Sequence, residues 1–433
     1  MKILVLGGGG REHAIVNALA RSPQQPELLC APGNPGIAAS ARCLPDLDPV
    51  DTAAVTDFAR DEGVDLVVVG PEAPLVAGVV DALNEAGIAA FGPGREAARL
   101  EGSKAFAKQA MEEAGVPTAG YSVVRDREAA LEAVASSSFP VVLKADGLAA
   151  GKGVLICLTE EEARAAVEIF FTEQRFGETE VVVEEFLDGE ELSLLAICDG
   201  ERAIPLSPAQ DYKRIGDGDT GLNTGGMGSY SPVPSIDDDT LAGLSAMVHQ
   251  PIVDLMASRG NPFHGVLYAG LMMSSNGIKV LEYNTRFGDP ETQAVLPRLK
   301  TDLVGLFEAA CRPGGLEDAE VEFAGDWAVT VVLASAGYPE SSSSGDVIDG
   351  LERASEIAEV VHAGTATAEV DGETRIVTAG GRVLNLTGLG PDPAAARQRA
   401  YDAAEAINFN GKQMRTDIAN RAVERAGQEE KID

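Results

Sequence analysis

Cysteine is scarce in this chain of 433 residues, and basic residues are outnumbered by acidic ones. The five cysteines are scattered and never form a C-x-x-C pair, so the sequence indicates neither a disulfide framework nor a zinc site. The net charge of −34, from 68 acidic and 34 basic residues, opposes binding to nucleic acid or to an anionic membrane. Because the acidic residues are spread along the chain, the charge also predicts a halophilic protein. No apolar run is long enough to span a bilayer and no secretory signal opens the sequence, so we expect a cytoplasmic protein.

A complete dinucleotide fingerprint is missing from the glycine-rich stretch GGGGREHA at residues 7–14. The fingerprint G-x-G-x-x-G requires a third glycine, and Glu12 or His13 stands in its place in either register. An NAD-dependent oxidoreductase is therefore disfavoured. A glycine-lined helix N-terminus still offers free backbone N–H groups to an anion, so the stretch is either a phosphate site or an ordinary tight turn.

Short apolar runs and amphipathic stretches alternate over about the first hundred residues. We expect strands at 1–6, 27–32, 65–71 and 88–93, separated by helices at 11–20, 53–63 and 74–87. This alternation implies a parallel sheet, with ligands at the carboxyl ends of its strands. Further along, residues 205–235 have no periodicity, the Asn276–Gly277 turn predicts a hairpin, and a separate small α+β unit begins near residue 325.

Two lysines and a glycine loop indicate a site for phosphate. The loop GLAAGKG at 147–153 departs from the Walker pattern, which excludes a P-loop NTPase, but a glycine loop between two strands can close over a triphosphate as a lid. Lys104 opens a helix and Lys144 ends an apolar strand. Either lysine alone is explained as a solvated side chain at the end of a helix or strand. The two lysines together with a lid would form a cation pair for phosphate oxygens.

The strand end at residues 180–187 combines apolar residues with carboxylates. Glu184 and Glu185 are followed by Phe186 and Leu187, with Glu191 after a turn. Such a slot suits an adenosine, whose base packs on aliphatic groups while its amino and hydroxyl groups meet acceptors. The alternative is an exposed acidic edge.

The run LEYNTRFGDPE at 281–291 predicts a metal and phosphate site. Strand alternation places Glu282, Asn284 and Arg286 on one face, with Leu281 and Tyr283 on the other. Oxygen ligands beside a guanidinium suit Mg²⁺, which shares its coordination shell with substrate phosphates. A structural salt bridge between Glu282 and Arg286 is the alternative.

The long segment 207–232 carries Asp211, Lys213, Arg214 and several glycines. It is a site for a small polar substrate if it is ordered, and a linker otherwise.

Taken in order, these motifs resemble those of the glycinamide ribonucleotide synthetases, a family of the ATP-grasp superfamily. The resemblance covers nearly the whole chain and rests on eight stretches: GGGGREHA, VVGPEAPL, LEGSKAF, KADGLAAGKGV, EEFLDGEE, DYKRIGDGDTGLNTGGMGSYSP, RFGDPETQ and VVHAGT. Two positions depart from the family pattern, since Gly8 stands where an asparagine is frequent and Thr285 where a cysteine follows the metal asparagine.

The fold that the resemblance implies is an α/β multidomain protein. A Rossmann-like parallel domain (1–103) would precede an ATP-grasp domain (104–324, with a lid at about 118–192), and a small α+β domain (325–433) would follow. The implied reaction joins glycine to 5-phosphoribosylamine with ATP, through a glycyl phosphate, in purine biosynthesis. We expect Mg²⁺ or Mn²⁺ as the metal and a monomer or weak homodimer.

The resemblance also assigns roles to individual residues. ATP would be held by Lys104, Lys144, Gly151, Lys152, Gly153, Glu184, Phe186, Leu187 and Glu191. The metal ligands would be Glu282 and Asn284, and the catalytic side chains Arg286, Asp211 and Lys213. The two other substrates would contact Gly9, Gly10, Glu72, Gly225, Gly226 and Asp289.

Two rival functions remain beside this one. Another ATP-grasp ligase acting on a ribonucleotide would share the lysines and the metal ligands but would not need the 207–232 segment. A noncatalytic nucleotide sensor would tolerate loss of the metal ligands.

Overall fold

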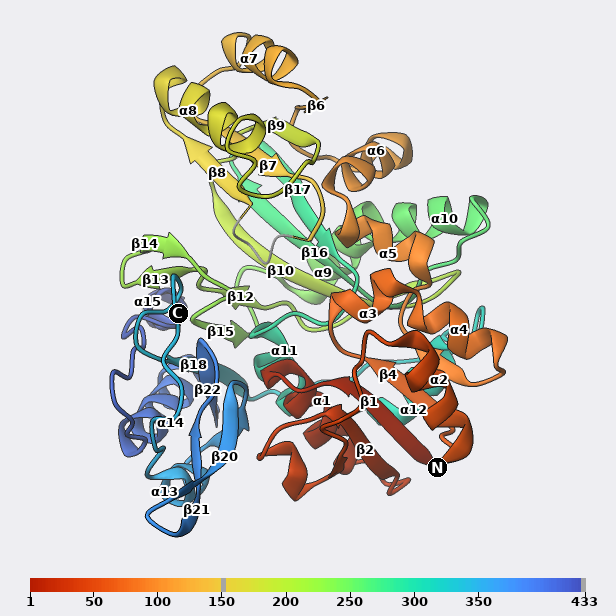
Figure 1. The fold of residues 1–433 in the computed structure, drawn as a ribbon, viewed down its shortest axis with the longest axis vertical. Coiled ribbons are helices and arrows are strands. Elements are labelled where there is room, and N and C mark those ends of the chain that lie inside the picture. Colours follow the sequence, from red (N-terminus) through yellow and green to blue (C-terminus); the bar gives the residue numbers. More distant parts are fainter. Residues whose placement is uncertain (149–152, 430–433) are drawn as a thin grey trace.

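The computed structural model describes residues 1–148 and 153–429. Its N-terminal part is a five-stranded parallel sheet of order β3-β2-β1-β4-β5 (Figure 1). The strands are β1 (Lys2–Gly7), β2 (Glu27–Pro32), β3 (Arg42–Cys43), β4 (Leu66–Val69) and β5 (Ala89–Phe91). The helices are α1 (Gly10–Ala20), α2 (Thr52–Asp61), α3 (Glu72–Ala77), α4 (Val79–Glu85) and α5 (Arg95–Gly102). The expected parallel sheet is confirmed.

Both faces of this sheet are buried, which explains why its strands are continuous apolar runs. Ile3 and Val5 pack into one core, whereas Leu4 and Leu6 pack into another on the opposite face. The prediction of a single helix over 74–87 is wrong in one respect. Gly78 has φ +89°, a left-handed conformation that ends α3 and starts α4.

Two antiparallel sheets form the middle of the chain. The smaller, at the top of Figure 1, has the order β6-β9-β7-β8 and is covered on one face by α7 (Arg127–Ala135) and α8 (Glu160–Phe171). Its strands are β6 (Tyr121–Val124), β7 (Val141–Ala145), β8 (Val154–Cys157) and β9 (Val181–Glu185), and α6 (Lys104–Ala114) leads into it. We call this four-stranded sheet with its two helices the lid.

The other sheet also has four strands, in the order β11-β10-β16-β17, and we call it the larger sheet because most of its strands are longer. It consists of β10 (Glu190–Asp199), β11 (Ala203–Pro205), β16 (His264–Ser274) and β17 (Gly277–Asn284), and the last two form the hairpin predicted from the Asn276–Gly277 turn. The helices of this part are α9 (Asp238–Val248), α10 (Gln250–Ser258), α11 (Glu291–Val295) and α12 (Leu303–Ala310).

The 205–235 segment is ordered, and it contains strands that its composition did not predict. Its middle is a hairpin of β13 (Arg214–Gly216) and β14 (Thr220–Asn223). Before and after the hairpin, β12 (Gln210–Asp211) and β15 (Gly228–Ser231) extend a sheet of order β12-β15-β18-β22-β19. The segment is therefore anchored to strands formed about a hundred residues later.

The C-terminal part completes that sheet with β18 (Trp327–Ala334), β19 (Glu359–His362) and β22 (Arg382–Gly390), on which α14 (Pro393–Ala406) packs. The remaining elements are a hairpin of β20 (Thr365–Val370) and β21 (Glu373–Thr378), and the helices α13 (Leu351–Ser355) and α15 (Asn420–Glu429). Within the described ranges, no helix is both long and apolar enough to cross a membrane.

Candidate active site

The structure brings the two expected lysines together at the base of the lid. Lys144, at the end of β7, contacts a carboxylate oxygen of Glu184, which is buried on the neighbouring β9. Lys104, the first residue of α6, donates to the carbonyl of Gly147 at 2.8 Å. Burial lowers the pKa of Lys104 and the charge of Lys144 adds to this effect, although Glu282 opposes it. These contacts show that Glu184 is not part of an exposed acidic edge.

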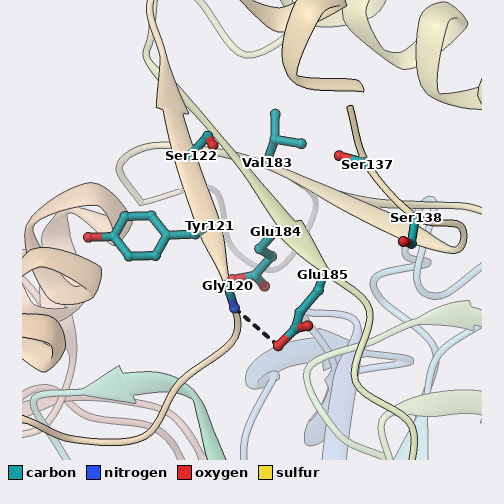
Figure 2. A pocket seen from close by; sticks show the side chains of 8 residues that line it. All are labelled: Gly120, Tyr121, Ser122, Ser137, Ser138, Val183, Glu184 and Glu185. Atoms are coloured by element: carbon teal, nitrogen blue, oxygen red, sulfur yellow. Dashed lines mark hydrogen bonds between the residues drawn. The ribbon is translucent and has the colours of Figure 1, made fainter. Parts of the chain in front are cut away.

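The rest of the expected nucleotide site is only partly described. Gly151 and Lys152 lie outside the described residues, whereas the carbonyl of Gly153 accepts from the backbone N–H of Ala145 at 2.8 Å. Phe186 and Leu187 follow β9, and Phe186 is exposed. Figure 2 shows a small cavity next to this strand, with Glu184 and Glu185 among its lining residues and a hydrogen bond from the N–H of Gly120 to Glu185.

Glu282 and Asn284 lie near the end of β17, on either side of Tyr283. Tyr283 is buried and its hydroxyl contacts the carbonyl of Val248, so the expected alternation holds there. A register shift against β16 skips Leu281, so the alternation fails at that residue. Burial works against the ionised form of Glu282, but the charges of nearby lysines and Arg286 outweigh it and hold its pKa below the ordinary value.

These residues fit a hard divalent cation. The charges that keep Glu282 ionised belong to Lys213, Lys144, Lys104 and Arg286. Three of them pair with other carboxylates, and within the described ranges no ion pair or hydrogen bond engages the carboxylate of Glu282. Within the described part of the chain, no group of three His, Cys, Asp or Glu side chains could hold a metal.

Arg286 lies just beyond β17 and is held by two carboxylates from the N-terminal part. Its Nη2 lies 2.9 Å from Oε1 of Glu101, and its Nε lies 3.3 Å from Oε2 of Glu72. The alternative of a salt bridge from Arg286 to Glu282 is therefore wrong. Burial disfavours the charged guanidinium, but Glu101 and Glu72 more than compensate and raise the pKa of Arg286.

Asp211 and Lys213 come from β12 and the residues after it, and Lys213 reaches a residue expected at the nucleotide. The Nζ of Lys213 lies 2.7 Å from Oε2 of Glu191, the residue expected at the ribose. Burial raises the pKa of Asp211 well above its ordinary value, and Lys213 only partly offsets this. The 207–232 segment is thus joined directly to Glu191, near the start of β10.

The glycines of the same segment lie against the loop after β17. The guanidinium of Arg382 donates to the carbonyls of Gly225 at 2.5 Å and of Asp289 at 2.8 Å, and also pairs with the carboxylate of Asp289 at 3.3 Å. Gly226 has φ +107° and packs against Pro290, so a side chain would be strained at this position. Arg382 therefore holds these two loops together.

The first glycine loop has less free anion-binding capacity than its sequence indicates. The N–H of Gly9 already donates to the carboxylate of Glu12 at 2.7 Å, and Arg11 pairs with the other oxygen of that carboxylate at 2.6 Å. Gly10 packs against the side-chain amides of Gln293 and Asn385. A Cβ atom at Gly9 would lie 3.9 Å from a carboxylate oxygen of Asp289, so this loop adjoins the Arg382 contact.

Several neighbours of the site were not predicted from the sequence. Lys108 follows Lys104 by four residues, and this helical spacing could have identified it. Glu101 and Arg382 pair with site residues that are far away in the sequence, so no local pattern could have identified them. Glu12 accepts from Gly9 only three residues before it, so its role in the glycine loop had a local signal.

The chain has a parallel sheet with helices, followed by two antiparallel sheets. Lysines and the carboxylate of Glu282 lie near the junction of the two antiparallel sheets. This arrangement is that of an ATP-grasp protein. The biotin carboxylase domain of a 2-oxoglutarate carboxylase from Hydrogenobacter thermophilus, solved with MgADP and bicarbonate, shares this fold. Its TM-score is 0.70 at 17% identity, over 95% of this chain and 91% of that one.

Models of phosphoribosylglycinamide synthetase match almost the whole chain: the N domain over residues 1–101, the ATP-grasp (A) domain over 102–292 and the C domain over 328–421. A phosphoribosylamine–glycine ligase of Streptomyces coelicolor is 53% identical over 427 residues, which cover 98% of this chain and 99% of that protein. The crystal structure of a phosphoribosylamine–glycine ligase from Thermotoga maritima has a TM-score of 0.82 and 36% identity, over 97% of this chain and 100% of that one. The chain therefore belongs to the phosphoribosylglycinamide synthetase family.

Proposed function

We propose that the chain joins glycine to 5-phosphoribosylamine at the expense of ATP, giving glycinamide ribonucleotide, ADP and phosphate. A carboxylate oxygen of glycine attacks the γ-phosphorus and ADP leaves. The amine nitrogen of phosphoribosylamine then attacks the acyl carbon of glycyl phosphate, phosphate leaves and the nitrogen loses a proton. The observation that carries the proposal is the set of cations near Glu282: Lys144 contacts Glu184, Lys213 lies 2.7 Å from Glu191 and Arg286 lies 2.9 Å from Glu101. Together with Lys104 they lower the pKa of Glu282.

The nucleotide is assigned to the junction of the lid and the larger sheet. Lys104 and Lys144 supply positive charge for the phosphates, and the role proposed for the 147–153 loop is to cover them. The adenosine is assigned to the β9 edge, where Glu184, Phe186 and Leu187 precede Glu191 in the sequence.

Glu282 and Asn284 are the residues that would hold Mg²⁺ or Mn²⁺. When bound, such an ion supplies positive charge against phosphate oxygens. The ionised state of Glu282 and the oxygen of the Asn284 amide match the ligands that both ions prefer.

Arg286 and Asp211 are the proposed catalytic groups. The guanidinium of Arg286 is fixed by Glu101 and Glu72 before substrate arrives, so it stabilises the transferred phosphoryl group or the acyl phosphate without reorganising. Asp211 is the proposed acceptor of the proton that the amine loses, since its raised pKa makes it a stronger base than an ordinary carboxylate. Lys213 lies beside it and would orient the carboxylate of glycine.

Phosphoribosylamine is assigned to the side of the site formed by the N-terminal sheet. Glu72 contacts Arg286 directly, and the loop of Gly9 and Gly10 approaches Asp289. Gly225 and Gly226 lie on the other side of Asp289 through their contacts with Arg382 and Pro290. This arrangement supports assigning the sugar phosphate and glycine to neighbouring loops, as the second step of the reaction requires.

The proposal is tested by measuring ADP release with each substrate omitted in turn. We expect release to require both glycine and phosphoribosylamine. Release that is unaffected by omitting glycine would refute the substrate assignment and favour another ATP-grasp ligase.

A further inference from the structure

Lys108 is a buried lysine that the mechanism above does not use, although it pairs with a residue of the proposed nucleotide site. Its Nζ lies 2.6 Å from Oε2 of Glu184, and the other oxygen of Glu184 contacts Lys144. The side chains of Lys108 and Glu184 are each 3% exposed and that of Lys144 is 9% exposed. Two ammonium groups therefore share one carboxylate, out of contact with water.

The two lysines are held differently. Lys108 also donates to Oγ1 of Thr118 at 2.8 Å, and this hydroxyl donates to the carbonyl of Val280 on β17 at 2.7 Å. Besides Glu184, Lys144 has only a contact of 3.5 Å with the carbonyl of Leu281 among the described residues. Lys108 is thus held by Thr118 as well as by Glu184, whereas Lys144 has the weaker second contact and is the lysine more readily turned toward a ligand.

The charge balance of this group of three charges explains the role of Lys108. A buried carboxylate with one ammonium partner forms a closed neutral pair, and a phosphate would then have to compete with that carboxylate for Lys144. With Lys108 present, Glu184 remains neutralised when Lys144 leaves it. The group carries one surplus positive charge, which a nucleotide phosphate compensates.

We propose that Lys108 is a positioning residue for the nucleotide: it neutralises Glu184 and so leaves Lys144 available to the phosphates. The inference rests on the proposed function, because it assumes the nucleotide site at the base of the lid.

The test is a double-mutant cycle on binding of MgADP, measured by isothermal titration calorimetry on the full chain. Lys108→Met is expected to weaken ADP binding about tenfold, because Glu184 then holds Lys144. In a Glu184→Gln background, the same substitution is expected to change ADP affinity less than about twofold, since no carboxylate competes for Lys144. Steady-state kinetics of Lys108→Met should show a raised KM for ATP and an unaltered KM for glycine.

Two control variants distinguish this role of Lys108 from an effect on folding. Lys279→Met removes the more exposed Lys279–Glu185 pair, whose carboxylate is the next residue on β9, and should leave ADP affinity within about twofold. Lys108→Arg keeps the positive charge beside Glu184 and should retain most of the ADP affinity even if Lys108→Met does not fold.

An equal loss from Lys108→Met in both backgrounds, wild-type affinity in folded Lys108→Met, or a tenfold loss in folded Lys108→Arg would each overturn the inference. A wild-type chain that binds no MgADP would instead overturn the proposed function.

Discussion

Replacing Arg286 by methionine separates its structural role from its catalytic one. The guanidinium lies 2.9 Å from Glu101, whose side chain is only 7% exposed, and 3.3 Å from Glu72, which is 32% exposed. Methionine has a similar volume and no charge. The substitution therefore leaves the carboxylate of Glu101 buried without its partner and that of Glu72 about one-third exposed.

The magnitude follows from this difference in burial. Breaking a buried ion pair by removing one partner costs about 3–5 kcal/mol, whereas loss of an exposed pair costs about 1 kcal/mol or less. The Glu101 contact thus dominates the expected loss of stability at pH 8. Burial already raises the pKa of Glu101, although Arg286 counters it, so without Arg286 this carboxyl takes up a proton more readily. The loss should therefore shrink as the pH falls toward 5.

Urea denaturation followed by circular dichroism at pH 8 and pH 5 measures these changes. Arg286→Met combined with Glu101→Gln removes the buried charge and should recover most of the lost stability. The double variant should still release ADP about 10²–10³-fold more slowly, the effect of removing one preorganised charge-stabilising donor. Recovery of activity together with stability would refute a direct role of Arg286 in the chemistry.

Three further outcomes follow from the charges of the site and of the whole chain. Glu282→Gln should lower kcat by about 10²-fold and raise the Mg²⁺ concentration needed for half of the maximal activity. Glu185→Gln should do neither. Equal metal dependence in both variants would contradict the metal assignment. Because the pKa of Asp211 is raised in the folded chain, its ionisation destabilises the fold as the pH rises above the unfolded value of about 3.9. Asp211→Asn should therefore raise the melting temperature more at pH 8 than at pH 4, and the reverse order would show that the carboxyl is not perturbed. The net charge of −34 leads us to propose a halophilic protein, whose urea midpoint should rise between about 0.1 and 1 M KCl; a falling midpoint would contradict this interpretation.

The N-terminal sheet could be predicted from the sequence because local pattern and burial agree there. The run at 27–32 coincides with β2, and the apolar stretches at 1–6 and 65–71 contain most of β1 and all of β4. Strands that are buried on both faces must be continuously apolar, and little else in a soluble chain has this pattern.

The strands of the 207–232 segment could not be predicted because their pairing partners lie elsewhere. Residues 228–231 are Gly-Ser-Tyr-Ser, which has weak strand propensity, and they form β15 by pairing with β18 a hundred residues later. The break at Gly78 was missed for a related reason: a glycine within an amphipathic pattern is tolerated in many helices, and only its φ shows that the helix ends.

The arrangement of the candidate site residues was predictable where they lie on a single strand. Glu282 and Asn284 flank a buried tyrosine on β17, and strand alternation alone indicates this arrangement. The partners of Arg286 and Asp289 were not predictable, because Glu101 and Arg382 are brought to them by the packing of separate sheets. Residue roles taken from the resemblance stay predictions until variants are measured.

The most direct test of the proposed reaction follows the carboxylate oxygens of glycine. If glycine attacks the γ-phosphorus and the amine then displaces phosphate, one oxygen of glycine leaves with the inorganic phosphate. Turnover with glycine labelled with ¹⁸O in both carboxylate positions should place one labelled oxygen in each phosphate released and leave one in the amide carbonyl of the product. Inorganic phosphate without the label would contradict the glycyl phosphate route, and with it the central account of this site.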